Sequence, residues 1–281
     1  MNASGTSAGL GLLSAATWGG SDFVGGLGAR RAPAILVVAS GHIVSFLLLV
    51  CICIGAHLAL PGRHDLLFAA IGGFEGSLAL ALFYHALAMG AMGLTAALTG
   101  LLTALVPVLF SFFSDGLPRP MTAVGLFGGL MAIWLITHTP NREGPATPPK
   151  ALLFGALAGT GFGIQLILFK IASGGGLLWT MTSARAAGSL AMVLVILTMP
   201  PKRPWKGFWQ LGVLAGMLDT LGNLFYIRAT QIGRLDVAAV VCSLYPAGTI
   251  LLAALVLREL PTKRQLAGMA FALCAVVLLS A

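Results

Sequence analysis

Charged residues are scarce in this chain. Only 9% of its 281 residues are charged, whereas 58% are hydrophobic. Because a soluble globular protein has about 25% charged residues, this composition excludes a water-soluble globule and indicates a protein surrounded by lipid. No basic segment precedes the first apolar run, which we therefore expect to be a retained membrane span and not a cleaved signal peptide.

Motifs of ATP-driven pumps and of metalloenzymes are missing as well. The sequence has no GxxxxGKS or GxxxxGKT loop to bind ATP, and it has no HExxH motif. Its His, Cys and acidic residues do not have the spacing of metal ligands, and its four cysteines lie within apolar runs, where thiols act as small buried hydrophobes. We therefore expect no cofactor, no metal and no catalytic residues.

The chain nevertheless carries a net charge of +8. Nearly all of its basic residues lie in short connections between apolar runs, and this placement fits anionic lipid headgroups better than a nucleic acid. We expect membrane lipid and a small-molecule substrate as partners, and no nucleic acid. A monomer is compatible with this pattern.

Apolar runs of about 20 residues, the length of a membrane-spanning helix, recur along the chain. Their separators are short and polar, except for one Pro-rich and charged linker at 139–150. The pattern predicts an all-α membrane protein with ten transmembrane helices. The predicted spans are 8–28, 34–57, 66–89, 93–114, 120–138, 151–173, 177–199, 207–230, 235–257 and 263–281.

The two halves of the chain align without a gap at an offset of 143 residues. The matching pairs include Thr17 with Thr160, Gly20 with Gly163, Ser40 with Ser183, Gly73 with Gly216 and Ala86 with Ala229. Each half has five spans, an odd number, so the second half enters the membrane from the opposite side. We therefore expect two inverted repeats, 8–138 and 151–281, around a central cavity. This is an architecture of secondary transporters, in which exchanging the conformations of the halves alternates access to the substrate.

Lysine and arginine are distributed unequally over the two sides of the predicted spans. Ten of those in the connections and span ends fall on one side and four on the other. Because positive charge favours the cytoplasmic side, both termini are predicted to lie outside the cytoplasm.

A few ionisable and polar side chains lie within the predicted spans. A charge near the middle of the bilayer costs about 2.5–3.5 kcal/mol on insertion scales, so such groups usually face the interior of a helix bundle. The offset aligns Asp22 with Gln165 and His42 with Arg185, and it places Glu75 one residue from the counterpart of Asp219. This recurrence predicts one shared polar cavity at the middle of the membrane, lined by the first and third spans of each half.

Two interpretations fit each charged residue. Arg185 attracts a substrate carboxylate, or it forms a structural ion pair with Asp219 or Glu75, because an unpaired buried charge is untenable. Glu75 and Asp219 couple transport to protons, because a buried carboxyl can bind and release a proton, or they are neutral hydrogen-bonded contacts between helices. The same alternatives apply to Asp22.

Aromatic residues, glycines and prolines complete the set of candidate site residues. Trp18, Phe83, Tyr84 and Tyr245 are expected as walls of the cavity. Glycines allow close approach of helices in lipid, and some of them serve as hinges; Pro within a span kinks its helix. The candidate hinge or kink residues are Gly19, Gly20, Pro107, Gly163 and Pro246.

With ten spans in two halves, the chain resembles the EamA-type members of the drug/metabolite transporter superfamily. The first half carries the segment Trp18-Gly19-Gly20-Ser21-Asp22-Phe23, and a pattern that runs from Phe83-Tyr84-His85-Ala86-Leu87 through Pro107 to Asp115-Gly116-Leu117-Pro118. The second half has Arg185 and a similar pattern from Tyr226 through Pro246 to Arg258-Glu259-Leu260-Pro261. The resemblance covers essentially the whole chain. It depends on the fact that similar motifs follow one another in the same order in both halves, more than on any single motif.

The resemblance implies a transporter of the bacterial inner membrane and not an enzyme. It implies a YddG-like exporter of aromatic and neutral amino acids or related metabolites. The polar and aromatic residues of the predicted cavity are the candidate substrate-binding residues: Trp18, Asp22, Glu75, Phe83, Tyr84, Gln165, Arg185, Asp219 and Tyr245. Two alternatives stay open at this point. One is export of lipophilic cations, favoured by the excess of carboxylates within the spans; the other, of another class, is an intramembrane lipid-modifying enzyme.

Overall fold

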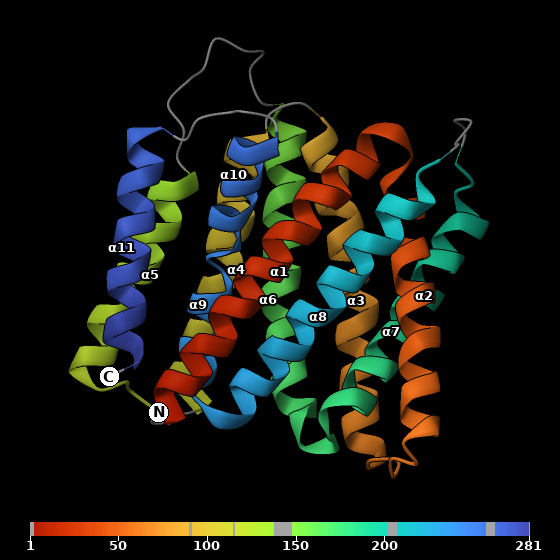
Figure 1. The fold of residues 1–281 in the computed structure, drawn as a ribbon, viewed down its shortest axis with the longest axis horizontal. Coiled ribbons are helices and arrows are strands. Elements are labelled where there is room, and N and C mark those ends of the chain that lie inside the picture. Colours follow the sequence, from red (N-terminus) through yellow and green to blue (C-terminus); the bar gives the residue numbers. More distant parts are fainter. Residues whose placement is uncertain are drawn as a thin grey trace.

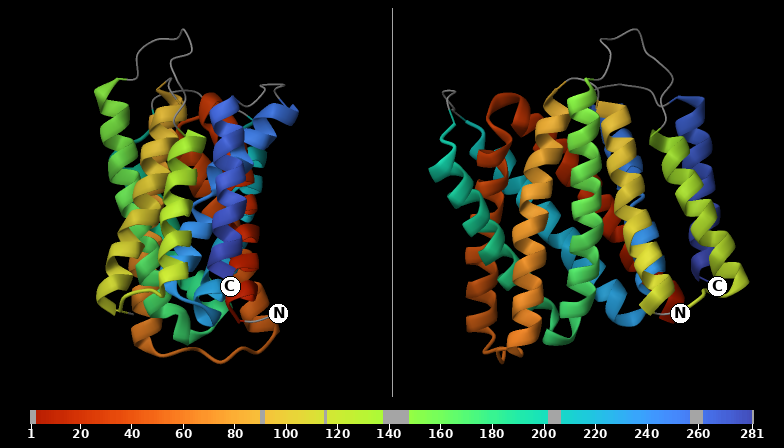
Figure 2. Two further views of the ribbon diagram at one scale, coloured as in Figure 1. Left: turned by 90° about the vertical axis from the view of Figure 1, so that its left-hand side faces the viewer. Right: turned by 180° about the vertical axis from the view of Figure 1, so that it is seen from behind.

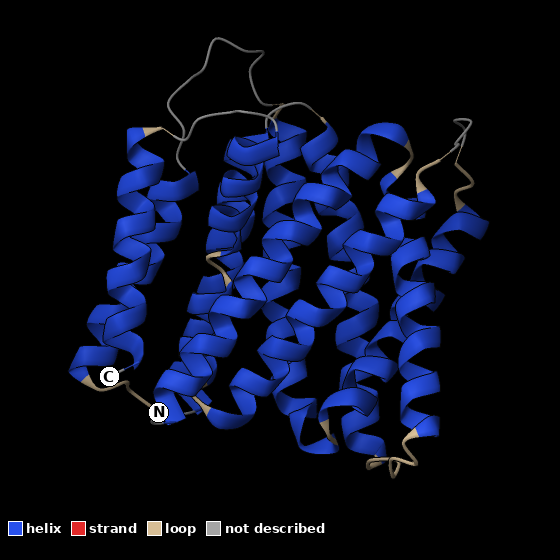
Figure 3. Ribbon diagram, viewed as in Figure 1, coloured by secondary structure: helices blue, strands red, loops and turns tan. Residues whose placement is uncertain are grey.

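The computed structural model describes residues 3–89, 92–114, 116–137, 148–201, 207–256 and 262–280. Asp115, the turn Arg258-Glu259-Leu260-Pro261 and all but the last three residues of the predicted linker at 139–150 lie outside these ranges. Within the described ranges every regular element is a helix (Figure 3). The prediction of an all-α protein is therefore confirmed.

Each of the ten predicted spans contains helix. In the first half the helices are α1 (Ala3–Arg31), α2 (Ala34–Gly55), α3 (Arg63–Ala88), α4 (Met92–Ser114) and α5 (Pro120–Thr137). In the second half they are α6 (Pro149–Ala172), the single 3-10 turn η1 (Ser173–Gly175), α7 (Leu177–Thr198), α8 (Trp209–Ile232), α9 (Leu235–Cys242), α10 (Tyr245–Val256) and α11 (Lys263–Ser280). Proline stands at the start of several of them, for example Pro120 and Pro149 as first residues, where the missing N–H is tolerated.

The ninth predicted span is not one helix but two. α9 ends at Cys242, and α10 begins at Tyr245 after the two-residue break Ser243-Leu244. Pro246 lies in the first turn of α10, and its missing N–H cannot continue the hydrogen-bond ladder of α9. In the first half, by contrast, Pro107 lies inside the continuous helix α4.

Successive spans run in alternating directions through the bundle, and α9 and α10 follow the same direction within one span. The first and last described residues lie at the same end, and the connection after α1 lies at the opposite end (Figure 1). α1 and α6 consequently run in opposite directions, as do α3 and α8. α1 and α8 lie on the face seen in Figure 1, whereas α3 and α6 lie on the face seen from behind (Figure 2).

Most helices are apolar enough for a lipid environment. Ala34–Gly55, Arg63–Leu87, Pro149–Gly175 and Leu177–Thr198 are both long and apolar enough to cross a membrane, by length and composition. Leu98–Ser114, Pro120–Leu135, Leu235–Thr249 and Leu266–Leu279 are apolar but shorter. α1 and α8 are long but belong to neither group, and they carry Asp22 and Asp219.

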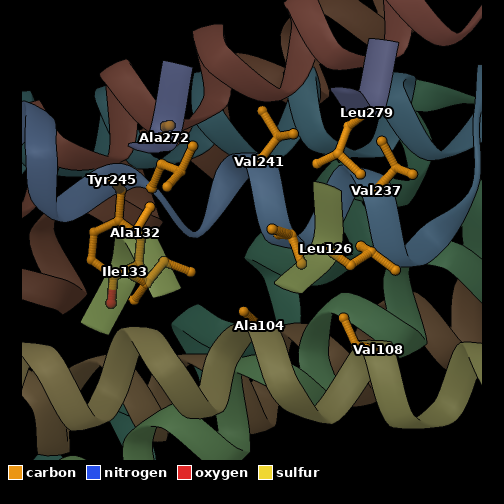
Figure 4. Packing of buried hydrophobic residues seen from close by; sticks show 13 residues of the cluster. Ala104, Val108, Leu126, Ala132, Ile133, Val237, Val241, Tyr245, Ala272 and Leu279 are labelled. Carbon is orange, nitrogen blue, oxygen red and sulfur yellow. The ribbon is translucent and has the colours of Figure 1, made fainter. Parts of the chain in front are cut away.

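Buried apolar side chains form three clusters between the helices. One cluster joins α1, α4, α5, α9, α10 and α11 and includes residues such as Val108, Leu126 and Val241 (Figure 4). On the outer surface, apolar side chains such as Leu197 and Phe127 are 73% and 67% exposed. Apolar residues thus fill the inside and also cover the outside, as expected where lipid is the solvent.

Candidate functional site

Arg185 is the centre of a polar network inside the bundle. Its guanidinium, carried by α7, is 3% exposed and makes three interactions through three different nitrogens. Nε donates to Thr220 Oγ1 at 2.9 Å, Nη1 donates to His42 Nε2 at 2.5 Å, and Nη2 forms an ion pair with Asp219 Oδ2. The planar fork of arginine suits this arrangement, and the ion pair balances a charge that could not otherwise be buried.

His42, on α2, links Arg185 to α3. The Ser77 hydroxyl donates its hydrogen to Gly73 O at 2.6 Å, so Ser77 Oγ accepts from His42 Nδ1 at 3.0 Å. His42 Nε2 accepts from Arg185, which has only donors to offer. The two bonds together assign a neutral imidazole with its proton on Nδ1.

The network is regular in sequence as well as in space. Ser77 and His42 are 35 positions apart, and so are Arg185 and Thr220. The Thr220 hydroxyl donates to Gly216 O at 2.7 Å, four residues earlier, as Ser77 does to Gly73. His42 and Arg185 are 143 positions apart, the offset that aligns the two halves. Asp219 breaks the regularity, because the residue aligned with it is Gly76.

Asp22 of α1 lies near this network but outside its hydrogen bonds. Its carboxylate is half-buried and makes no hydrogen bond or ion pair with the described residues. The neighbouring Ser21 donates to Ala215 O at 2.9 Å, and Tyr84 Oη donates to Ser21 O at 3.4 Å. Asp22 is therefore a carboxylate that a ligand or an ion can pair with.

A small hollow lies between α1, α2, α3 and α8, next to the polar network of Arg185. It is lined by Ser21, His42, Tyr84 and Asp219 among others and has a volume of about 10 Å³, room for about one water molecule. A larger hollow of about 360 Å³, lined by Ser4, Lys170 and Arg234 among others, lies at the end of the bundle where the chain begins. The central polar groups are thus closely packed in this conformation.

Three aromatic rings lie close to one another at α1, α8 and α10. Trp18, one turn before Asp22 on α1, has its ring centroid 6.1 Å from that of Tyr226 and 6.4 Å from that of Tyr245, with the second pair edge to face. Trp18 Nε1 is buried and has no hydrogen-bond partner within the described part of the chain, and the same holds for Asn223 Oδ1. The Tyr226 and Tyr245 rings and the two unpaired polar atoms are buried between the helices in this conformation.

Glu75, Phe83 and Gln165 lie apart from Arg185, at the contact between α3 and α6. The Glu75 carboxyl packs where a Cβ of Gly161 would stand, and the Gln165 amide packs against Gly76. Glu75 Oε2 is buried without a hydrogen-bond partner in the described ranges. Phe83 stacks edge to face on Phe162, with centroids 5.9 Å apart, inside an apolar cluster.

Two of the three candidate hinge glycines, Gly19 and Gly163, lie where helices cross closely. A Cβ on Gly19 would lie 2.7 Å from Tyr245 O and 2.9 Å from Gly248 Cα, at the break between α9 and α10. A Cβ on Gly163 would lie 2.6 Å from Val106 Cβ of α4, whereas one on Gly20 would meet only ordinary contacts. Gly19 is thus required by close packing at the broken helix.

The structure brings Arg185, Asp219 and His42 together, and it leaves Glu75 and Gln165 at another helix contact. Of the two predicted partners for Arg185, Asp219 is the one that pairs with it. Sequence reasoning missed Ser77 and Thr220, although the offset of 143 aligns these two hydroxyl residues. It also missed Asp236, which is fully buried and pairs with Arg234 at 2.9 Å at the start of α9. Among the described residues, no group of three or more His, Cys, Asp or Glu is arranged to hold a metal ion.

Comparisons with known proteins show which proteins the chain is similar to. No curated protein matches it. A solved structure titled "Crystal structure of protein" matches with a TM-score of 0.75 and 17% identity, over 99% of this chain and 96% of that one, which shows that the fold is shared over the full length. Residues 149–281 match the model of the EamA-like transporter family, whose members are transporters and not enzymes. This match shows that the second half of the chain is similar to EamA-like transporters, and the apolar helices make the chain a multi-pass membrane protein.

Proposed function

We propose that this protein is a secondary transporter built from two inverted repeats, 8–138 and 151–281, which moves small organic molecules across the membrane by alternating access. The observation that carries the proposal is the hydrogen bond between His42 and Arg185. Two residues that correspond in the halves of an inverted repeat can touch each other only on the axis that relates those halves. Alternating access is what such symmetry provides.

The packing of the helices supports the same relationship. α1 packs against α8 as α6 packs against α3, and α1 packs against α9 and α10 as α6 packs against α4. α2 packs against α7, and α5 packs against α11, and each of these pairs is its own counterpart under the offset of 143. The opposite directions of α1 and α6 agree with inversion (Figure 1).

Amino acids with aromatic or neutral side chains are the substrates we propose first, exported across the inner membrane of a bacterium. Asp22 would pair with the ammonium group, and the rings of Trp18 and Tyr245 would contact the side chain. Arg185 would receive the carboxylate if Asp219 released it. Glu75 and Asp219 are the proposed proton-coupling groups, and positive charge at the end opposite the termini favours that end as cytoplasmic.

Flux measurements in proteoliposomes test the proposal. The purified protein is reconstituted, loaded with radiolabelled phenylalanine, leucine or alanine, and placed under a pH gradient or a membrane potential. We expect efflux of at least one of these amino acids, reduced in the variant Asp22→Asn. The absence of flux for every amino acid under every gradient would refute amino-acid export.

Export of lipophilic cations is a second candidate, and one observation favours it. Arg185 is occupied by Asp219, His42 and Thr220, whereas Asp22 is unpaired among the described residues and lies beside aromatic rings. A carboxylate with aromatic faces binds organic cations well. Cells that produce the protein would then grow in methyl viologen at concentrations that stop cells without it, and the Asp22→Asn variant would lose this protection.

A further inference from the structure

Apart from the Arg185–Asp219 ion pair, the interactions at the centre of α2, α3, α7 and α8 correspond in the two halves. His42 bonds Ser77 as Arg185 bonds Thr220, and both hydroxyls donate to the carbonyl four residues earlier. The backbones also approach equally: a Cβ on Gly41 would lie 2.7 Å from Gly216 Cα, and a Cβ on Gly73 would overlap Ala184. The pair Gly73 and Ala184 is the counterpart of Gly216 and Gly41 at the offset of 143.

Away from this centre the two halves differ. The Ser183 hydroxyl of α7 donates to Leu66 O of α3 at 2.8 Å, so this hydrogen bond joins two helices. Ser40 of α2, which aligns with Ser183, instead donates to Val37 O of its own helix at 2.9 Å. The residue that aligns with Leu66 is Trp209, at the start of α8 and at the opposite end of the bundle. One end of the assembly therefore holds a bond that its counterpart at the other end lacks.

When the halves exchange conformations, interactions that both halves make behave differently from interactions that only one half makes. An interaction that is present in both halves at once is still present after the exchange. An interaction that only one half makes is lost, and its counterpart forms in its place. His42 and Arg185 are themselves counterparts in the two halves. When the halves exchange conformations, the hydrogen bond between these two residues is therefore kept.

We propose that the His42–Arg185 hydrogen bond is the pivot of the transport cycle, about which α2–α3 and α7–α8 rock. The Ser183–Leu66 contact at one end would be exchanged for a Ser40–Trp209 contact at the other. His42 acts here as a positioning residue: its neutral ring supplies the acceptor that holds Arg185 on the axis. This inference rests on the proposed function, because it assigns a moving part to alternating access.

Disulfide trapping tests the exchange without any substrate. In a variant whose four native cysteines are replaced by alanine, the pairs Leu66→Cys with Ser183→Cys and Ser40→Cys with Trp209→Cys are introduced separately and then together. We expect each pair alone to form a bridge under mild oxidation in membranes. In the combined variant each molecule should carry one bridge or the other, so that a maleimide gel-shift assay counts two remaining thiols per molecule.

Two results would overturn the exchange. One is a population in which both bridges form in the same molecule, leaving no free thiol. The other is failure of the Ser40–Trp209 pair to form a bridge at any oxidant concentration that closes the Leu66–Ser183 pair. Neither result would contradict transport by the protein without introduced cysteines. Conversely, if the two bridges exclude each other but no substrate is transported, the proposed transport function is refuted and the exchange is not.

The pivot itself is tested by changing His42 in the combined variant. His42→Gln keeps an acceptor near the position of Nε2 and should preserve the exclusion of one bridge by the other. His42→Asn is too short to reach Arg185 and should raise the fraction of doubly bridged molecules severalfold. Equal exclusion in both variants, with unchanged thermal unfolding midpoints in detergent, would show that the bond does not couple the two ends.

Discussion

Arg185 Nη1 donates a hydrogen bond to His42 Nε2 across 2.5 Å, and the two residues are 143 positions apart. The same distance in sequence separates the aligned glycines, serines and alanines of the two halves. A lysine at position 185 would lack the fork that reaches three partners, and a charged imidazole at position 42 would present a proton to the guanidinium. The bond therefore sets the identity and the protonation of both side chains.

The ion pair between Arg185 and Asp219 should be costly to break from one side only. Its side chains are 4% and 16% exposed, and removing one partner of a buried pair costs about 3–5 kcal/mol because the other charge stays behind. We expect Arg185→Leu and Asp219→Leu each to lower the thermal midpoint strongly, and the double variant to recover much of the loss. Fluorescence-detected unfolding in detergent measures all three, and an additive double variant would contradict the pairing.

Close helix contact makes Gly73 sensitive to a single added carbon. A Cβ there would overlap the backbone of Ala184, whereas a Cβ on Gly26 meets no atom within 4 Å. We expect Gly73→Ala to cost about 1–3 kcal/mol through overpacking, and Gly26→Ala to be neutral or slightly stabilising because alanine favours helix. Thermal unfolding of the two variants decides this, and equal midpoints would show that α3 and α7 can separate freely.

Much of the fold follows from the sequence because it depends on local composition. Apolar runs with short polar separators predict where helix occurs, and every predicted span contains helix. The predicted kink at Pro246 lies three residues after the start of a complete break at Ser243. Proline predicts a disrupted ladder, but whether the helix bends or stops depends on neighbours such as Gly19, which are distant in sequence.

The candidate site is harder to predict because an alignment gives correspondence and not contact. The offset of 143 pairs His42 with Arg185, yet nothing in the sequence says that the two residues touch. Glu75, by contrast, is nearly aligned with Asp219 but does not share its contact. It lies one residue from the counterpart of Asp219, and a shift of one residue turns a side chain by about 100° around a helix. Glu75 consequently packs against Gly161 on α6 and does not pair with Arg185.

Pro246 is expected to maintain the break between α9 and α10. In Pro246→Ala the restored N–H would let the helix run through Ser243 and Leu244, and it would change the packing of Tyr245 beside Gly19. We expect a protein that folds normally but transports at least about tenfold more slowly, since the hinge would be stiffer. Pro107→Ala, in the continuous helix α4, is the matched control and should have a smaller effect on the flux.

Asp22 should matter for transport far more than for stability. Its carboxylate is half-buried and makes no hydrogen bond or ion pair with the described residues, so Asp22→Asn removes a charge without stranding a partner. A hydrogen bond to a charged group contributes about 1.5–3 kcal/mol, which corresponds to a loss of about 10- to 100-fold in affinity for a substrate ammonium group. Substrate-induced shifts of the unfolding midpoint, measured over a concentration series, report this affinity directly. Asp65→Asn, in the first turn of α3 and outside the proposed site, is the matched control, because it removes the same charge. Equal affinities in the wild type and in Asp22→Asn would show that Asp22 does not contact the substrate, whatever the effect on flux.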